Sequence, residues 1–438
     1  MSKTRDKLSL AGVYEFRSGL SKPRSAFGTG APFLSFKDVF YNSAVPEPLK
    51  ELVESSAKEQ HNCSVRRGDV FLTRTSETMD ELGMSCVALK DIPGATFNGF
   101  CKRLRPKVAD QIVPEYARYF FRSKRFRDQV NAMATMSTRA SLNNEMLERL
   151  EIDTPAIVEQ SAIGAILGTL DEKIELNHKM NQTLEEIAKA IFKSWFVDFD
   201  PVRAKAEGRP TGLPPEISDL FPDELVDSEI GEIPKGWDIG SISDFAFLNK
   251  KTVNPSQSSE IYEHFSIPAF DTGQSPVLDL GTDIKSNKTL VVEGSLLVSK
   301  LNPNTPRVWL PNPKNRYEQI CSTEFMVFTA TAKSNVAFLW GLFTSSVVAE
   351  RMEAMVTGTS KSHQRVKPND VSNITVVTPD ARLMKAYGGT VLPMLDRTLV
   401  GKSESRVVAE LRDTLLPKLI SGDLRIPDAE KFLEEAGL

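Results

Sequence analysis

Four short blocks of this 438-residue chain recur at a nearly constant offset, and this recurrence limits the fold more than any other feature. The second member of each pair lies 222 to 226 residues after the first. The pairs are Val65–Arg74 with Val291–Lys300, Met133–Arg139 with Met355–Lys361, Ile152–Ala156 with Val376–Asp380, and Ile187–Phe196 with Leu411–Ile420. Each match is weak alone, but the shared offset predicts two copies of one structural unit.

The two copies share an order of local signals. A turn at Gly68 or Gly294 precedes a short apolar strand, which ends in a hydroxyl residue and a cation, Thr73-Arg74 or Ser299-Lys300. A hydroxyl-rich loop that also ends in a cation follows further along each copy. We therefore expect each copy to be a mixed α/β domain followed by a long helix.

The first long helix has the heptad spacing of a coiled-coil seam. Its seam positions, taken in alternate steps of four and three, are Ile163, Leu167, Leu170, Ile174, Asn177, Asn181, Leu184, Ala188, Ile191 and Trp195. The two asparagines in mid-seam are typical of positions that set register and partner choice. Asp198–Pro201 should end this helix, because proline disfavours helical conformation in the residue before it.

The second long helix has a less regular seam. It opens at Leu392, Leu395 and Leu399, continues at Lys402 and Arg406, and after a slip resumes at Val408, Leu411, Leu415 and Leu419. Pro417 predicts a kink or an early stop. Ser421–Asp423 reads as a turn.

Residues 201–237 are rich in proline, glycine and acids and are interpreted as a linker with little structure of its own. A linker here would allow the two long helices to pack antiparallel within one molecule. The 33 residues from Ile163 to Trp195 would span roughly 50 Å. The predicted fold is α+β: two similar mixed α/β domains, related by a pseudo-twofold internal repeat and joined by an intramolecular antiparallel coiled coil.

The predicted boundaries follow from these signals. They are a first domain at 1–153, a first helix at 154–202, a linker at 203–230, a second domain at 231–379, a second helix at 380–426 and a tail at 427–438.

Composition and charge narrow the class of protein. A hydrophobic fraction of 40% and a charged fraction of 26% are those of a soluble globular protein. No apolar run long enough to span a membrane and no signal peptide is present in the sequence, so we expect a cytoplasmic protein without membrane contact. The four cysteines form no CxxC pair and are interpreted as reduced thiols, and no metal site is expected.

Charge divides unevenly along the chain. Residues 1–150 hold 24 basic and 17 acidic side chains, a net of +7, whereas residues 151–230 hold 7 and 17, a net of −10. The densest basic stretch runs from Lys102 to Arg127. A basic first domain favours a polyanionic partner, and a solvated helix face is the alternative.

At two places the sequence resembles a known family, the specificity subunits of type I restriction-modification systems. Ile163–Glu185, Ile187–Lys205 and Gly231–Trp237 resemble the central conserved region of that family. Leu415–Ile426 resembles its distal conserved region. The resemblance covers the order of elements along essentially the whole chain, and it is weak inside the two domains.

The resemblance implies two target-recognition domains, each reading one half of an asymmetric, interrupted site in double-stranded DNA. The paired helices would set the gap and dock two modification subunits, which carry S-adenosylmethionine and methylate adenine. Restriction subunits that use ATP and Mg²⁺ would join them. No cofactor would be bound by this chain itself.

The sequence lacks the motifs of a catalyst. It has no NPPY-like methyltransferase motif, no GxGxxG, no GxxxxGK[ST] and no convincing PD…ExK nuclease pattern. These absences favour a binding subunit. Three alternatives remain open here: a self-sufficient methyltransferase or nuclease, a protein-binding coiled-coil adaptor, and a specificity subunit of a methylation-only or type IIB-like system.

The candidate DNA-binding residues lie at the repeated strand ends, in the hydroxyl-rich loops and in the basic stretch. Arginine pairs with guanine and glutamine with adenine by geometry, and any cation can bind phosphate. The candidates are Arg74, Lys102, Arg103, Arg105, Ser137, Thr138, Arg139, Lys300, Thr359, Ser360, Lys361, Gln364 and Arg365.

Overall fold

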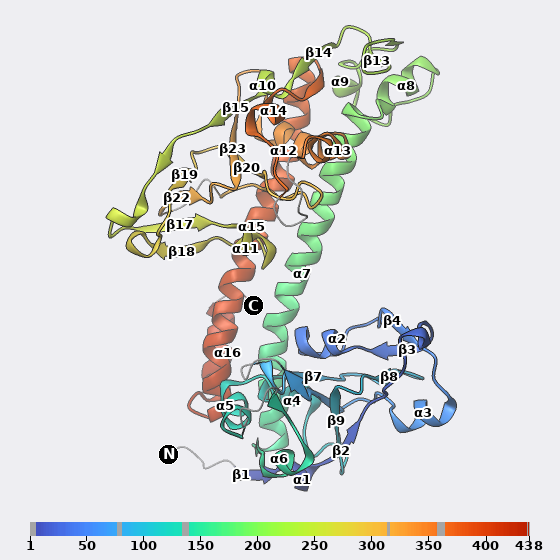
Figure 1. Ribbon diagram of the computed structural model, residues 1–438, viewed down its shortest axis with the longest axis vertical. Coiled ribbons are helices and arrows are strands. Elements are labelled where there is room, and N and C mark those ends of the chain that lie inside the picture. Colours follow the sequence, from blue (N-terminus) through green and yellow to red (C-terminus); the bar gives the residue numbers. More distant parts are fainter. Residues whose placement is uncertain are drawn as a thin grey trace. The chain divides into compact units, whose positions relative to one another are not determined.

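The computed structural model describes residues 6–76, 81–133, 140–312, 316–356, 364–435 and 437 (Figure 1). The chain divides into two compact units. Unit 1 comprises Met1–Leu176 and Ser405–Leu438, and unit 2 comprises Asn177–Glu404. The predicted boundaries between domains, helices and linker remain predictions.

Unit 1 is built around an antiparallel sheet with the strand order β2-β9-β5-β7. Its strands are β2 (Tyr14–Ser18), β9 (Cys101–Pro106), β5 (Val70–Thr73) and β7 (Ser85–Val87). A second sheet has the order β4-β3-β8, in which β3 pairs antiparallel with β4 and parallel with β8. Its strands are β3 (Phe27–Leu34), β4 (Glu51–Val53) and β8 (Thr96–Phe97). A short ladder pairs β1 (Asp6–Ser9) with β11 (Glu151–Thr154).

Unit 2 repeats this architecture. Its four-stranded sheet has the order β15-β23-β20-β21, formed by β15 (Ala246–Asn249), β23 (Phe325–Ala330), β20 (Ser295–Ser299) and β21 (Val308–Trp309). Its five-stranded sheet has the order β16-β19-β22-β17-β18. The strands are β16 (Thr252–Val253), β17 (Ile261–Phe265), β18 (Val277–Leu280), β19 (Lys288–Leu290) and β22 (Glu318–Cys321). The ladder of β14 (Asp238–Ser241) with β24 (Thr375–Thr378) corresponds to β1 with β11.

The predicted internal repeat is confirmed by the matching strand orders and by the turns that precede β5 and β20. Gly68 has φ +86° and Gly294 has φ +73°, a backbone conformation that favours glycine. Successive side chains of β5 enter two different cores, because they point to opposite faces of the strand: Val70 and Leu72 join one, and Phe71 joins the other. Leu297 and its neighbours in β20 divide in the same way.

Short helices also recur in the two units. In unit 1 they are α1 (Leu10–Val13), α2 (Phe36–Tyr41), α3 (Ala57–Asn62), α4 (Pro114–Phe120), α5 (Lys124–Met133), α6 (Asn144–Arg149) and the C-terminal α16 (Ile426–Glu435). In unit 2 they are α10 (Ile242–Phe245), α11 (Ile267–Asp271), α12 (Val336–Thr344), α13 (Ser346–Ala354) and α14 (Pro368–Ser372). In both units one pair of helices, α4 and α5 or α12 and α13, follows the last strand of the four-stranded sheet directly.

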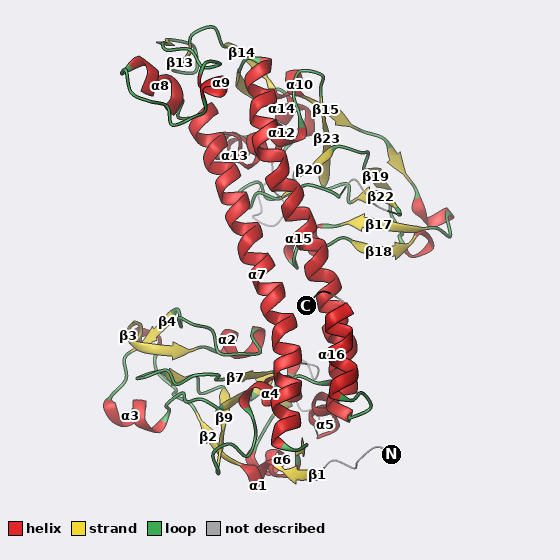
Figure 2. Cartoon of the chain, turned by 180° about the vertical axis from the view of Figure 1, so that it is seen from behind, coloured by secondary structure: helices red, strands yellow, loops and turns green. Residues whose placement is uncertain are grey.

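The two long helices are α7 (Ile157–Phe196) and α15 (Ala381–Ser421), both continuous in Figure 2. Each helix contributes to both cores. In unit 1 the first half of α7 packs with the last part of α15, and the buried seam residues there are Ile163, Leu167, Leu170, Leu415 and Leu419. In unit 2 the second half of α7 packs with the first part of α15, and the buried seam residues there are Ala188, Trp195 and Leu395.

All but one of the remaining seam positions agree with the heptad prediction. Asn177 and Asn181 are buried, although their side chains are polar. Val408 is buried, and seven further predicted positions are partly buried: Ile174, Leu184, Ile191, Leu392, Leu399, Lys402 and Leu411. The first helix also ends where expected, at Phe196 just before Asp198–Pro201, and Phe199 then adopts a left-handed conformation.

The predicted seam of α15 is wrong at Arg406, which is exposed. The buried positions in that stretch are Thr398, Gly401 and Ser405, a register that an apolar pattern does not show. A small residue is required at 401, because a Cβ on Gly401 would lie 2.5 Å from Oδ1 of Asn181. The asparagine side chain therefore occupies the space that a larger seam residue would fill.

An early stop at Pro417 does not occur, since α15 continues through it to Ser421. Proline removes one backbone hydrogen bond, but Leu415, Leu419 and Ile420 on both sides are buried in the core of unit 1. The predicted turn follows at Gly422, which has φ +80°.

Residues 201–237 are more ordered than predicted. They form α8 (Asp200–Ala206), α9 (Pro215–Ser218) and a ladder of β12 (Leu225–Val226) with β13 (Ile233–Pro234). Val202, Phe221 and Trp237 enter the core of unit 2, where Trp195 contacts the ring of Phe221 edge-on at 5.4 Å between centroids. Burial of the Phe221 and Trp237 side chains stabilises this segment. The proline and glycine content of the sequence does not predict that burial.

Candidate DNA interface

In unit 1 the end of β5 is held next to the segment that follows the first hydroxyl-rich loop. Arg74 follows β5 and is exposed. Beyond it β6 (Thr75–Ser76) pairs antiparallel with β10 (Ala140–Ser141). The Arg74 carbonyl accepts a hydrogen bond from the Leu142 N–H at 2.8 Å, and the Arg74 N–H donates to the Phe100 carbonyl at 2.8 Å.

Unit 2 builds the same frame after β20. The Lys300 carbonyl accepts from the Val366 N–H at 3.0 Å, and the Lys300 N–H donates to the Glu324 carbonyl at 2.9 Å. A bridge between Leu301 and Arg365 corresponds to the pairing of Thr75 with Ser141. The structure thus brings Arg74 and Lys300 to equivalent places, each beside the segment that follows its hydroxyl-rich loop.

The hydroxyl-rich loops themselves lie outside the described residues. This holds for Ser137, Thr138 and Arg139 in unit 1 and for Thr359, Ser360 and Lys361 in unit 2. Their predicted role in DNA binding remains a prediction.

Three basic candidates of β9 are held by internal partners. The Lys102 ammonium donates to Asn144 Oδ1 at 2.8 Å, and burial, with a smaller contribution from Arg74, lowers its pKa. Arg103 is 5% exposed and donates to the carbonyls of Asn62 and Ser64. Arg105 forms an ion pair with the buried Asp69. DNA contact by Arg103 or Arg105 would first require these bonds to break.

The candidates of unit 2 lie close together. Lys300 is partly exposed at the strand end. The Gln364 carbonyl accepts from the Asn302 N–H at 2.9 Å, which places Gln364 directly before the bridge to Leu301. Arg365 donates to both carboxylate oxygens of Glu324, through Nε at 3.0 Å and Nη2 at 3.2 Å. The hydrogen bond to Glu324 raises the pKa of Arg365, which therefore stays charged.

Sequence reasoning missed two residues of this frame, Phe100 and Glu324. Phe100 is 62% exposed, and Glu324 is the partner of Arg365. Neither residue belongs to a recurring block. Phe100 is apolar and Glu324 is acidic, so a pattern of cations and hydroxyl residues does not include them. The repeat offset of 224 between them is the signal that links them.

Each unit ties its domain to both long helices through one charged side chain. In unit 1 this is Asp171 of α7, which accepts from Arg412 of α15 and from Arg118 and Tyr119 of α4, each at 2.7 Å. Burial raises the pKa of the Tyr119 phenol, so it remains a donor to Asp171.

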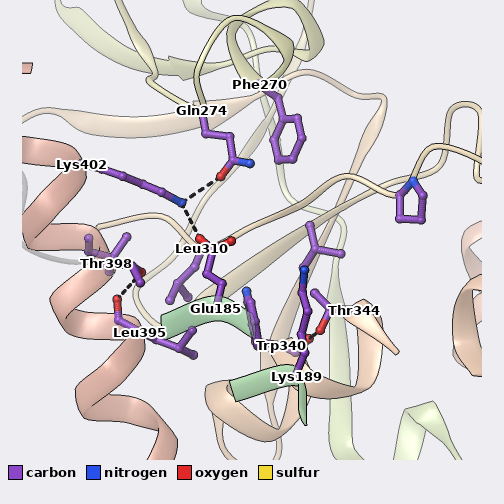
Figure 3. Close-up of a pocket in the computed structure, with 13 residues that line it drawn as sticks. Glu185, Lys189, Phe270, Gln274, Leu310, Trp340, Thr344, Leu395, Thr398 and Lys402 are labelled. Carbon is purple, nitrogen blue, oxygen red and sulfur yellow. Dashed lines mark hydrogen bonds and ion pairs between the residues drawn. The ribbon is translucent and has the colours of Figure 1, made fainter. Parts of the chain in front are cut away.

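In unit 2 the corresponding side chain is Lys402 of α15. Its ammonium donates to Glu185 of α7 at 3.0 Å and to Gln274, which follows α11, at 2.9 Å (Figure 3). These groups line a cavity of about 320 Å³, in which the Lys189 ammonium lies 5.9 Å from the centre of the Trp340 ring. Lys402 thus joins both long helices and the domain within this unit.

The described parts of the chain contain neither a candidate metal centre nor a membrane-spanning helix. Among those residues, no group of three or more His, Cys, Asp and Glu side chains is placed to hold a metal ion. The helices within these parts include none with the length and apolar character needed to cross a membrane.

Comparison with known proteins gives a consistent result. A family model described as the type I restriction modification DNA specificity domain matches residues 6–186. The chain is 24% identical to the type I restriction enzyme MjaIX specificity subunit of Methanocaldococcus jannaschii, over 93% of this chain and 90% of that protein. It is 26% identical to the HindI specificity subunit of Haemophilus influenzae, over 67% of this chain and 73% of that protein.

A solved structure shares the fold. The crystal structure of the type I restriction-modification S subunit from M. genitalium matches with a TM-score of 0.55 and 14% identity, over 94% of this chain and 95% of that chain. The α+β fold, with two β-rich domains and the long helices α7 and α15 packed together, is thus one that an S subunit also adopts. In its family model match, its relatives and its fold, the chain is thus similar to the specificity subunits of type I restriction-modification systems.

Proposed function

We propose that this chain selects a bipartite DNA site, with one half read by each β-rich domain. The observation that carries the proposal is the duplicated frame at Arg74 and Lys300, which presents a cation at the same place in each domain. Cations supply the affinity for phosphate, and a few base-edge contacts supply the specificity. Two alike readers suit a site with two separate halves.

The long helices would set the gap between the two halves and dock the partners. The support is that α7 and α15 each contribute to the cores of both units, so each helix is anchored in both. In this proposal two modification subunits bind S-adenosylmethionine and methylate adenine, and restriction subunits add ATP- and Mg²⁺-dependent cleavage. This chain contributes recognition and scaffolding rather than catalysis.

The proposal is tested by mapping methylated adenines across the genome of a host that expresses this chain with its modification partner. We expect one asymmetric motif with two specified halves and a constant unspecified gap. A single uninterrupted motif would contradict the two-reader proposal. Methylation by the purified chain alone, with DNA and S-adenosylmethionine, would contradict its scaffolding role.

Substituting Arg74 with alanine should weaken binding to the cognate site about tenfold, within the range of a lost charged contact. The slope of log affinity against log salt should also fall by about one if the contact is to phosphate. A matched control is Lys124→Ala on α5. It also removes one positive charge, but from a side chain that is 83% exposed and pairs with Asp128 on the same helix. Equal losses in a salt-controlled titration of both variants would count against Arg74.

The hydroxyl-rich loops give a second prediction. Arg139→Ala and Lys361→Ala should each weaken cognate binding by about fivefold to tenfold, because in this proposal each residue is a cation that binds DNA. A fluorescence anisotropy titration at fixed salt measures the loss. Unchanged affinity in both variants would remove these loops from the proposed interface.

A further inference from the structure

The frame that follows β5 and β20 is duplicated in its backbone but not in its side chains. The Asn98 side chain accepts from the Phe100 N–H at 2.8 Å, and in unit 2 the Ser322 side chain accepts from the Glu324 N–H at 3.3 Å. The Phe100 carbonyl also accepts a hydrogen bond from the Arg74 N–H, and the Glu324 carbonyl accepts one from the Lys300 N–H. Phe100 and Glu324 therefore occupy one structural position in two copies.

In unit 1 this position is apolar and open. The Phe100 side chain is 62% exposed. Its neighbour across the frame is the exposed Arg74. An exposed phenylalanine gains little from folding, whereas beside a cation it could contact an apolar group of a polyanion.

In unit 2 the same position is occupied by an acidic residue, Glu324, which forms an ion pair with Arg365. Both oxygens of Glu324 accept from the Nε and Nη2 atoms of Arg365, the residue that corresponds to Ser141 in unit 1. A bidentate pair fixes the plane of a guanidinium as well as its position. Arg365 is thus oriented before any ligand arrives, while its side chain is still 42% exposed.

We propose that this shared position determines what each half-site contains. Phe100 contacts the methyl group of a thymine in the half read by unit 1. Glu324 acts as a positioning residue in unit 2, where it aims Arg365 at a guanine, the base whose O6 and N7 match an arginine fork. This inference rests on the proposed two-part recognition, and it explains how one fold reads two different halves.

The test is methylation mapping of single variants expressed with the modification partner, because each half of the motif then serves as the control for the other. In Glu324→Ala, the preference for guanine at one position of the second half should fall at least about fivefold, and the first half should not change. In Phe100→Ala, the preference for thymine at one position of the first half should fall by a similar factor, and the second half should not change. Glu324→Gln, which keeps an oxygen acceptor for Arg365, should restore part of the guanine preference.

The outcomes separate the inference from the proposal beneath it. A wild-type chain that yields no two-part motif defeats the proposed function. A wild-type two-part motif that both alanine variants reproduce unchanged defeats the inference alone. If Glu324→Ala lowers the melting temperature and abolishes methylation, a second variant, Arg365→Lys, is needed to test the inference. Lysine keeps the positive charge at position 365 but lacks the two-pronged guanidinium that matches guanine. Relaxation at one position of the second half then supports the inference, and an unchanged motif overturns it.

Discussion

Four residues inserted into each long helix should lengthen the gap of the recognised DNA site by one to two base pairs and leave both specified halves unchanged. The insertions belong between Leu176 and Asn177 and between Glu404 and Ser405, where the two compact units meet in the sequence. One turn adds about 6 Å, and a base pair of B-DNA rises about 3.4 Å. Both helices are lengthened so that the pairings inside each unit, such as Asp171 with Arg412, are kept.

Methylation mapping measures this gap directly. The matched control carries the same four residues after Gly208, an exposed position where an added Cβ meets nothing within 4 Å. That variant should read the parental motif with the parental gap. An unaltered gap in the helix variant, or altered bases in either half, would reject the spacer role of α7 and α15.

Replacing Asp171 with alanine should lower the free energy of unfolding by about 3 kcal/mol, because it leaves two partly buried arginines without their shared carboxylate. Arg118 and Arg412 each lie 2.7 Å from Asp171, and their side chains are 20% and 29% exposed. The Tyr119 hydroxyl loses its acceptor in the same variant. The loss is large because this single side chain joins α4, α7 and α15.

Urea denaturation of the full chain measures this loss. Asp128→Ala is the matched control, since Asp128 forms an exposed pair with Lys124 on one helix face, and such a pair contributes at most about 0.5 kcal/mol. Similar midpoints for the two variants would show that Asp171 does not hold unit 1 together. Asp171→Asn should lie between them, because the amide keeps one oxygen acceptor.

The periodic features of this fold are predictable from the sequence, because they repeat. Ile163, Leu167 and Leu170 are placed in the core by heptad spacing alone. The match of β5 with β20 follows from a constant offset between short blocks. Such signals sum over many residues, so single exceptions do not hide them.

The exceptions depend on contacts between residues far apart in the sequence. Arg74 and Arg103 both lie near apolar strands, yet Arg74 is exposed and Arg103 is buried against the carbonyls of Asn62 and Ser64. Nothing local separates the two. The small seam residue Gly401 is equally hard to predict, because the space for a Cβ there is limited by the Asn181 side chain of the other helix.

The sequence predicts the basic side chains of the candidate interface. It does not predict the residues that hold these side chains in place. Lys300 and Arg365 are recognisable as cations after a strand and a loop. That Arg365 is oriented by Glu324, 41 residues earlier, depends on the bridge between Leu301 and Arg365. Pairings of this kind require the sheet topology.

The ordered segment at residues 201–237 decides where recognition modules could be exchanged between relatives. A chimaera joined at Gly231 would take Trp237 from one parent and Val202 and Phe221 from the other, although all three share one core. Mismatched volumes there would create cavities or clashes far from any DNA contact. A graft of the second module should instead carry this whole stretch with it, together with the end of α7 on which it rests.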